Sequence, residues 1–154
     1  MTDYARNTAV SARKSRMELE GMLEKFGAYR IATLVDRDTS MVAFSAHDRQ
    51  IRLSLPVPQL DDRKFTHTPT GKKRDAHGTQ VELEKEIRRR WRSLVLLVKA
   101  KITAINDGIV EFEEEFLPHV VMADGSTVFE RAKEQISIEY ETGKPTQLLL
   151  GNFQ

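Results

Sequence analysis

The hydrophobic pattern is most regular between residues 81 and 106. Apolar residues recur there at alternating spacings of three and four, which places them on one face of an α-helix. They are Ile87, Trp91, Leu94, Val95, Val98, Ile102 and Ile105. At about 100° per residue, a second row on the other side of this helix is basic. Its members are Lys85, Arg88, Arg89, Arg92 and Lys99. The pattern predicts a long core helix that presents cations on its outer side.

An earlier and shorter helix is predicted to begin at Ser15. Ser15 and Glu18 have the spacing of a capping box, in which two side chains satisfy backbone N–H groups at the start of a helix. Gly27 supplies the left-handed residue that commonly ends one. The inner face is expected to carry Leu19, Met22, Leu23 and Phe26. Residues 1–10 show no period and are predicted to be a loose N-terminus.

Between residues 28 and 57 the period changes to two, which is the period of a β-strand. Three runs, 29–35, 41–46 and 51–57, are separated by short polar clusters. Connections of this length predict an antiparallel three-stranded meander. Pro56 and Pro58 are expected to end the third strand, because proline has no N–H to donate to a neighbouring strand.

The next segment, residues 59–80, is polar and contains Pro69, Gly71 and Gly78. These residues interrupt both helical and strand patterns. We therefore predict a long polar loop, which at this length is either functional or mobile.

Two further helices are predicted after the long one. A brief helix around Phe112 and Phe116 is expected to end at Pro118. The last helix is expected to start at a second capping box, formed by Thr127 and Glu130. Its inward face is expected to carry Val128, Ala132, Ile136 and Tyr140.

Together these elements predict an α+β fold. The order is an N-terminal helix, a three-stranded antiparallel meander, a long central helix and a C-terminal helical tail. A chain of 154 residues has the usual size of one domain, so residues 1–154 are expected to form a single domain. The alternating strands offer one apolar side to the helices, which leaves the other side of the sheet for solvent or a partner.

Composition narrows the possible functions only slightly. The chain has 24 Lys and Arg against 23 Asp and Glu, so charge can matter only through its placement. It has no cysteine, which excludes disulfides, thiolate metal sites and a cysteine nucleophile. It has no apolar run long enough for a signal peptide or a membrane span, so we expect a cytoplasmic protein with no membrane partner.

The candidate binding residues are two groups of cations. We predict that Lys72, Lys73 and Arg74 of the loop fold back over the start of the long helix and join Arg88, Arg89 and Arg92 there. Six cations in one groove would contact the phosphates of DNA or RNA. The alternative is a solvated charged helix with ion pairs at helical spacing, such as Glu84 with Arg88 and Glu86 with Arg90.

No catalytic, metal or cofactor site is predicted. Trp91 lies on the apolar stripe and is interpreted as a core anchor, not as a platform for a nucleic-acid base. Residues 68–73, TPTGKK, lack the spacing of a phosphate-binding P-loop. The four histidines do not have metal-ligand spacing. The acidic segment 111–115 is interpreted as a surface for solubility or partner contact.

Three stretches of the chain resemble a family of small proteins encoded in tailed-phage and prophage genomes. They read NTAVSARKSRMELEGMLEKFGA, FTHTPTGKKR and RRRWRSLVLLVKAKITAINDGIVEFEEEFLPHVVMADGSTV, and lie within residues 7–128. No activity is established for that family, so the resemblance implies a genomic origin and no catalytic residues. Many small phage proteins act in DNA replication, recombination or host takeover, and a DNA-side role is expected by that association.

The leading hypothesis is therefore a small phage-type accessory protein that binds nucleic acid without catalysing a reaction, mainly through phosphates. If it is phage-encoded, it would act in the host cytoplasm. The alternative is a protein–protein interaction module that inhibits or regulates a host protein. Its surface would be the open face of the sheet or the acidic segment 111–115.

Overall fold

The structure is a computed structural model that describes residues 3–36 and 38–148, with side chains from residue 11 onward. Its elements follow the predicted α+β order. They are α1 (Asp3–Phe26), β1 (Tyr29–Val35), β2 (Thr39–Ala46), β3 (Arg49–Pro56), α2 (Arg63–Thr66), α3 (Ala76–Asn106), α4 (Phe112–Phe116), the short 3-10 helix η1 (Leu117–His119) and α5 (Val128–Thr142).

The three strands form one antiparallel sheet in the order β1-β2-β3, which confirms the meander. The turn between β2 and β3 consists of His47 and Asp48, whose φ angles of 49° and 60° are both left-handed. Two such residues make a type I′ turn, whose twist matches that of the flanking strands. The polar sequence at 47–50 therefore makes a tight hairpin without a glycine.

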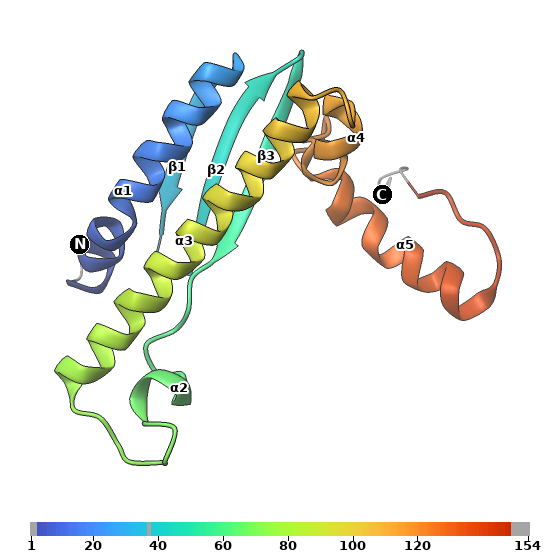
Figure 1. The fold of residues 1–154 in the computed structure, drawn as a ribbon. Helices are drawn as coiled ribbons and strands as arrows, with labels where there is room; N and C mark the ends of the chain where they lie inside the picture. Colours follow the sequence, from blue (N-terminus) through green and yellow to red (C-terminus); the bar gives the residue numbers. More distant parts are fainter. Residues whose placement is uncertain (1–2, 37, 149–154) are drawn as a thin grey trace.

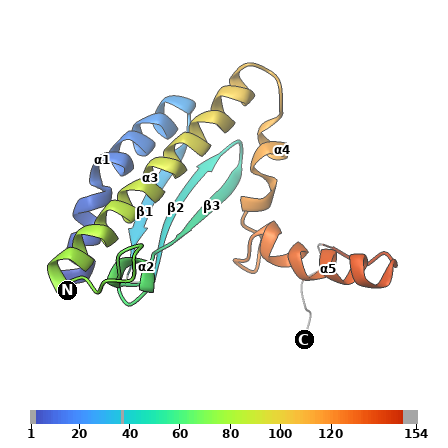
Figure 2. The same cartoon turned by 60° about the horizontal axis from the view of Figure 1, so that its bottom comes forward.

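The helices α1 and α3 lie side by side on one face of this sheet (Figures 1 and 2). The core lies between the two layers, and the apolar stripe of α3 supplies much of it. The buried residues of that stripe are Leu83, Ile87, Trp91, Leu94, Val95, Val98 and Ile102. The sheet contributes Val42, Phe44, Ile51 and Leu53, all at most 2% exposed. The predicted packing of the long helix on the strands is confirmed.

The first helix is longer than predicted, and the expected loose N-terminus is wrong for residues 3–10, which are helical. Ser15 lies inside α1, so its capping-box spacing with Glu18 does not mark a start. Ala12 is fully buried seven positions before Leu19, which shows that the buried stripe continues past Ser15. A small alanine on that stripe gave too weak a signal for the period to be recognised.

The end of α1 is as predicted. Gly27 has a φ of 100°, and its N–H donates to the carbonyl of Glu24 at 3.0 Å. The next N–H, from Ala28, donates to the carbonyl of Leu23 at 2.9 Å. These two bonds form a Schellman motif, which satisfies carbonyls left open at the helix end.

Residues 59–80 are folded, and the expected structureless loop is wrong. Phe65 is 3% exposed and anchors α2, while the side chain of Asp62 accepts the N–H of Lys64 at 3.2 Å to cap it. His67 then pairs with Lys73 in a small hairpin. One buried aromatic residue and local backbone bonds order this segment, and hydrophobic periodicity cannot detect either.

The long helix begins at Ala76, five residues before the predicted start at 81. Asp75 caps it, because its side chain accepts the N–H of Gly78 at 2.6 Å. Residues 76–80 contain no strongly apolar side chain, so the helix start is set by this cap and not by the apolar period.

The C-terminal helix forms as predicted but packs differently. Thr127 and Glu130 make the reciprocal capping box, and Gly143 ends the helix with a φ of 66°. However, α5 projects away from the body (Figures 1 and 2), and Ile136 and Tyr140 are 44% and 89% exposed. The prediction that they face inward is wrong, because the core is already closed by α1, α3 and the sheet. Of the four predicted inward residues, only Val128 is buried.

Candidate nucleic-acid interface

The solvent side of α3 carries a row of cations, as its period predicts. Four of them follow each other at spacings of three, four and seven, which keeps them on one side of the helix. They are Lys85, Arg88, Arg92 and Lys99, and all four are exposed. Arg89 is also exposed and lies next to this row. We call these five residues the basic row; at the usual helical rise it is about 21 Å long.

The side chains of three members of the basic row have no polar partner in the part of the chain that the structure describes. They are Arg88, Arg92 and Lys99. Lys85 contacts Glu82 at 3.1 Å, one turn away and exposed. The predicted pair between Glu84 and Arg88 is absent, and Glu84 instead accepts a hydrogen bond from Gln80 at 3.2 Å. The row is therefore available to an external anion along most of its length.

Arg74, one of the predicted phosphate ligands, has an internal role. Its Nη1 atom donates to the carbonyl oxygens of Lys64, Phe65 and His67 at 3.1, 3.2 and 2.6 Å. These carbonyls belong to α2 and the residue after it, so Arg74 ties the end of the hairpin to α2. Lys72 and Lys73, its neighbours in the sequence, are exposed.

Residues 59–80 and the basic row meet at Glu86, which contacts both Lys64 and Arg89. Lys64 fixes α2 against α3 by contacting Glu86 at 3.3 Å. At 100° per residue, Arg88 lies about 160° around the helix from Glu86, and Arg92 about 120° around it. The structure therefore does not bring Arg74 together with Arg88 and Arg92, since α2, to which Arg74 is bound, packs on the Glu86 side of α3.

Glu86 is the centre of the contact between α2 and α3. Besides Lys64, its carboxylate accepts from Arg89 at 2.6 Å and from Arg90 at 3.0 Å, which confirms the predicted Glu86 to Arg90 pair. The hydrogen bond from Arg89 is the main cause that lowers the pKa of Glu86 to about 2, with Arg90 and Lys64 adding to it and partial burial opposing it. The same bond raises the pKa of Arg89. Arg89 is thus shared between the basic row and this cluster.

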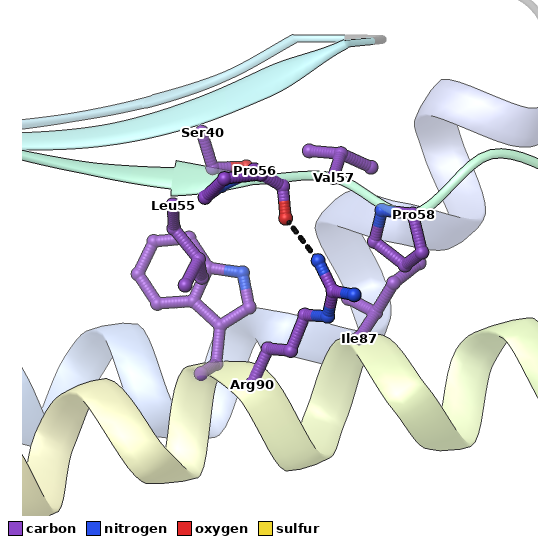
Figure 3. A pocket seen from close by; sticks show the side chains of 8 residues that line it. Ser40, Leu55, Pro56, Val57, Pro58, Ile87 and Arg90 are labelled. Atoms are coloured by element: carbon purple, nitrogen blue, oxygen red, sulfur yellow. Dashed lines mark hydrogen bonds between the residues drawn. The ribbon is translucent and has the colours of Figure 1, made fainter.

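Arg90 and Trp91 face the sheet. Figure 3 shows the Arg90 guanidinium reaching the end of β3, where its Nη1 donates to the carbonyl oxygen of Pro56 at 2.8 Å. The cavity between these groups measures about 10 Å³, which is the size of one water molecule. Trp91 lines it and is 1% exposed, which confirms the core-anchor interpretation. This site cannot hold a nucleotide or a small substrate.

A larger cleft of about 610 Å³ lies between α2, the hairpin and the first turns of α3. Charged residues of both signs line it: the cations Arg63, Lys64 and Arg74 and the carboxylates Asp62 and Glu82. Two of these cations already have internal partners. Although this cleft is larger than the cavity beside Trp91, it is a weaker candidate for binding an anion than the basic row.

Three of the four histidines, His47, His67 and His119, have contacts or burial within the fold. The His47 ring stacks on Phe112 with centroids 4.5 Å apart, and His67 Nδ1 lies 2.8 Å from the hydroxyl of Thr66. Burial lowers the pKa of His119. Within residues 3–36 and 38–148, no group of three or more His, Asp or Glu side chains is placed to hold a metal ion. Over the same residues, no helix is long and apolar enough to cross a membrane.

Comparison of the chain with protein-family models, curated proteins and solved structures found no match. The functional argument therefore rests on the residues and geometry of this chain alone.

Proposed function

We propose that the protein binds the backbone of a nucleic acid, without catalysis, through the basic row of α3. The observation that supports this most is the set of three exposed, unpartnered cations, Arg88, Arg92 and Lys99, on one side of one helix. A chain with a formal net charge of +1 has no general excess of cations, so their concentration on α3 is local.

The geometry of the row matches a polyanion better than a single small anion. Five cations spread over about 21 Å cannot converge on one phosphate, but they can follow a strand whose charges are spaced at about 3.4 Å along the axis of a duplex. Contacts of this kind go to phosphates and carry no direct sequence information. Binding is therefore expected to be similar for unrelated sequences and to weaken as salt is added.

The test is a salt titration with fluorescently labelled oligonucleotides, followed by anisotropy. The double variant Arg88→Ala with Arg92→Ala should reduce the slope of log K against log salt by about 1.8 for duplex DNA, since each phosphate contact contributes about 0.9. The matched control, Lys72→Ala with Lys73→Ala, removes the same charge from the hairpin and should leave the slope nearly unchanged. Thermal unfolding of both variants checks that the fold is retained.

Two results would contradict the proposal. Equal losses in the two double variants would mean that the contact depends on overall charge or on the hairpin, not on the basic row. Absence of binding by the parent protein to single-stranded and duplex oligonucleotides at low salt would remove the nucleic acid as a partner. In that case the protein–protein interaction module becomes the better explanation of the exposed surfaces.

A further inference from the structure

Within residues 3–36 and 38–148, apolar side chains are exposed on two surfaces away from the basic row. The first is the apolar stripe of α5, in which Phe129, Ile136 and Tyr140 are 56%, 44% and 89% exposed. Soluble proteins seldom leave several large apolar side chains exposed in one stripe without a partner. Acidic residues outnumber basic ones on α5, because Glu130, Glu134, Glu139 and Glu141 accompany only Arg131 and Lys133.

The second surface is the face of the sheet opposite α1 and α3. Strand register places Leu34 beside Met41 in one row and Ala32, Ala43 and Arg52 together in the next. Leu34 is 53% exposed. Because alanine side chains are short, Ala32 and Ala43 leave a depression in the middle of this face. A groove of about 250 Å³ lies there, with Met41, Ala43, Arg30 and Arg52 in its lining.

The charges of these two surfaces are complementary. The strands contain no acidic residue, and Arg30 and Arg52 line the groove on the open face. Arg49 lies on the other face and pairs with Glu113. Contact between the two types of surface already occurs within the chain at one point, where Arg52 contacts the carboxylate of Glu130 at 3.2 Å. An acidic helix with an apolar stripe therefore suits the open face of this sheet in both shape and charge.

The α5 helix is held in a position that does not cover the sheet of its own chain. The segment before it is attached to the edge of β3, because Val121 N–H donates to the carbonyl of Gln50 at 2.8 Å and Val120 pairs with Ile51. From that edge α5 runs away from the body (Figures 1 and 2) and packs on η1. Folding back onto its own sheet would require breaking this attachment.

We propose that the protein self-associates by placing α5 of one copy on the open face of the sheet of a second copy. The dimensions agree, since a 15-residue helix is about 22 Å long and an 8-residue strand about 26 Å. A two-fold arrangement uses both surfaces of each copy once and closes without leaving either exposed. It buries the stripe of α5 on the open face of the sheet, next to Arg30.

The test compares the oligomeric state of the parent protein with that of two single variants by sedimentation over a range of concentrations. Ile136→Asp places a charge on the stripe of α5, and Leu34→Glu places one on the open face of the sheet. Each should weaken association at least about a hundred-fold, because both copies of the contact lose an apolar group and would bury a charge. The control is Ile109→Asp, which alters a side chain that is 74% exposed and belongs to neither surface. Circular dichroism confirms that the variants are folded.

A mixing experiment tests whether α5 of one copy pairs with the sheet of the other. The Ile136→Asp copy retains an intact sheet face and the Leu34→Glu copy retains an intact α5, so a mixture of the two should form a heterodimer with one intact contact. Three results would overturn the proposal: a parent protein that is monomeric at all concentrations, a Leu34→Glu variant that still dimerises, or an Ile136→Asp variant that does so. The second would indicate pairing between two α5 helices, and the third pairing between two sheets. None of these results bears on the binding of nucleic acid by α3.

Discussion

The helices α3 and α5 carry the same kind of pattern and have different surroundings. Each has apolar residues at spacings of three and four and a side-chain cap at its start. In α3 the stripe is buried, with Trp91 and Val98 at most 1% exposed, whereas in α5 Tyr140 is 89% exposed. The difference shows that an amphipathic pattern specifies which face of a helix is apolar but not what covers that face.

The two stripes differ in burial because other helices already cover the core face of the sheet. The sheet offers one face to helices, and α1 and α3 together cover it. The helix α5 is held outside that core, at its N-terminal end, by the 120–128 segment and the Arg52 to Glu130 ion pair. A 15-residue helix with an exposed apolar stripe is close to the length at which isolated helices are marginal, so the cap of α5 and its proposed partner matter for its stability.

The largest expected effect comes from comparing the same kind of substitution in the apolar stripes of α3 and α5. Val98→Asp buries an unpaired charge at a fully buried position of α3 and should unfold the domain, whereas Ile136→Asp on α5 should change the melting temperature of the monomer little. Thermal unfolding by circular dichroism, at a concentration low enough to avoid association, measures both. A Val98→Asp protein that melts like the parent would mean that α3 does not form the core.

A second comparison asks whether the folded segment before α3 depends on Arg74. Arg74→Ala removes three hydrogen bonds to backbone carbonyls and leaves these carbonyls without that donor, so we expect a loss of about 2 kcal/mol in the free energy of unfolding. Lys73→Ala, at the exposed neighbouring position, should cost less than about 0.5 kcal/mol. Urea unfolding measures the two values. Equal values would show that the hairpin does not need the arginine.

The ion pairs of Glu86 with Lys64, Arg89 and Arg90 should stabilise the fold in a way that depends on pH. Because the folded-state pKa of about 2 lies below the ordinary value of 4.5, the carboxylate stabilises the fold above pH 4.5, and this contribution decreases as the pH falls from 4.5 towards 2. Glu86→Gln should therefore lower the stability by about 1 to 2 kcal/mol near neutral pH, reduced by the exposure of Lys64 and Arg89. The stabilities of parent and variant should approach each other below pH 4.5. A difference that does not change with pH would contradict the ion-pair origin.

The smallest expected effect concerns the end of α5. Tyr140→Ser should leave the free energy of unfolding of the monomer within about 0.5 kcal/mol of the parent value, because the side chain makes little contact with its own chain. In the proposed dimer the same change should reduce association. A clear loss of monomer stability would show that α5 packs on its own body in solution.

Much of the fold followed from the sequence because its signals are local and strong. The change of period from 3.6 to 2 and back located the sheet and the long helix, and Gly27 and the Thr127 to Glu130 box marked helix ends correctly. The exposed side of α3 followed from the same period, since the cations opposite a buried stripe must face outward. The sequence did not reveal the folding of residues 59–80, which depends on the single buried Phe65, or the N-terminal half of α1, where the buried residue is the small Ala12.

The sequence by itself determined the elements, their order, and which side of each helix is apolar or basic, because neighbours along the chain control backbone hydrogen bonds and periodicity. Only the tertiary structure decided which of those sides meet. The packing of α2 on the Glu86 side of α3 placed α2 away from Arg88 and Arg92, and Arg74 donates to backbone carbonyls of α2 and the residue after it. The closure of the core by α1, α3 and the sheet left α5 uncovered. Both outcomes depend on contacts between residues distant in the sequence, to which a local pattern is insensitive.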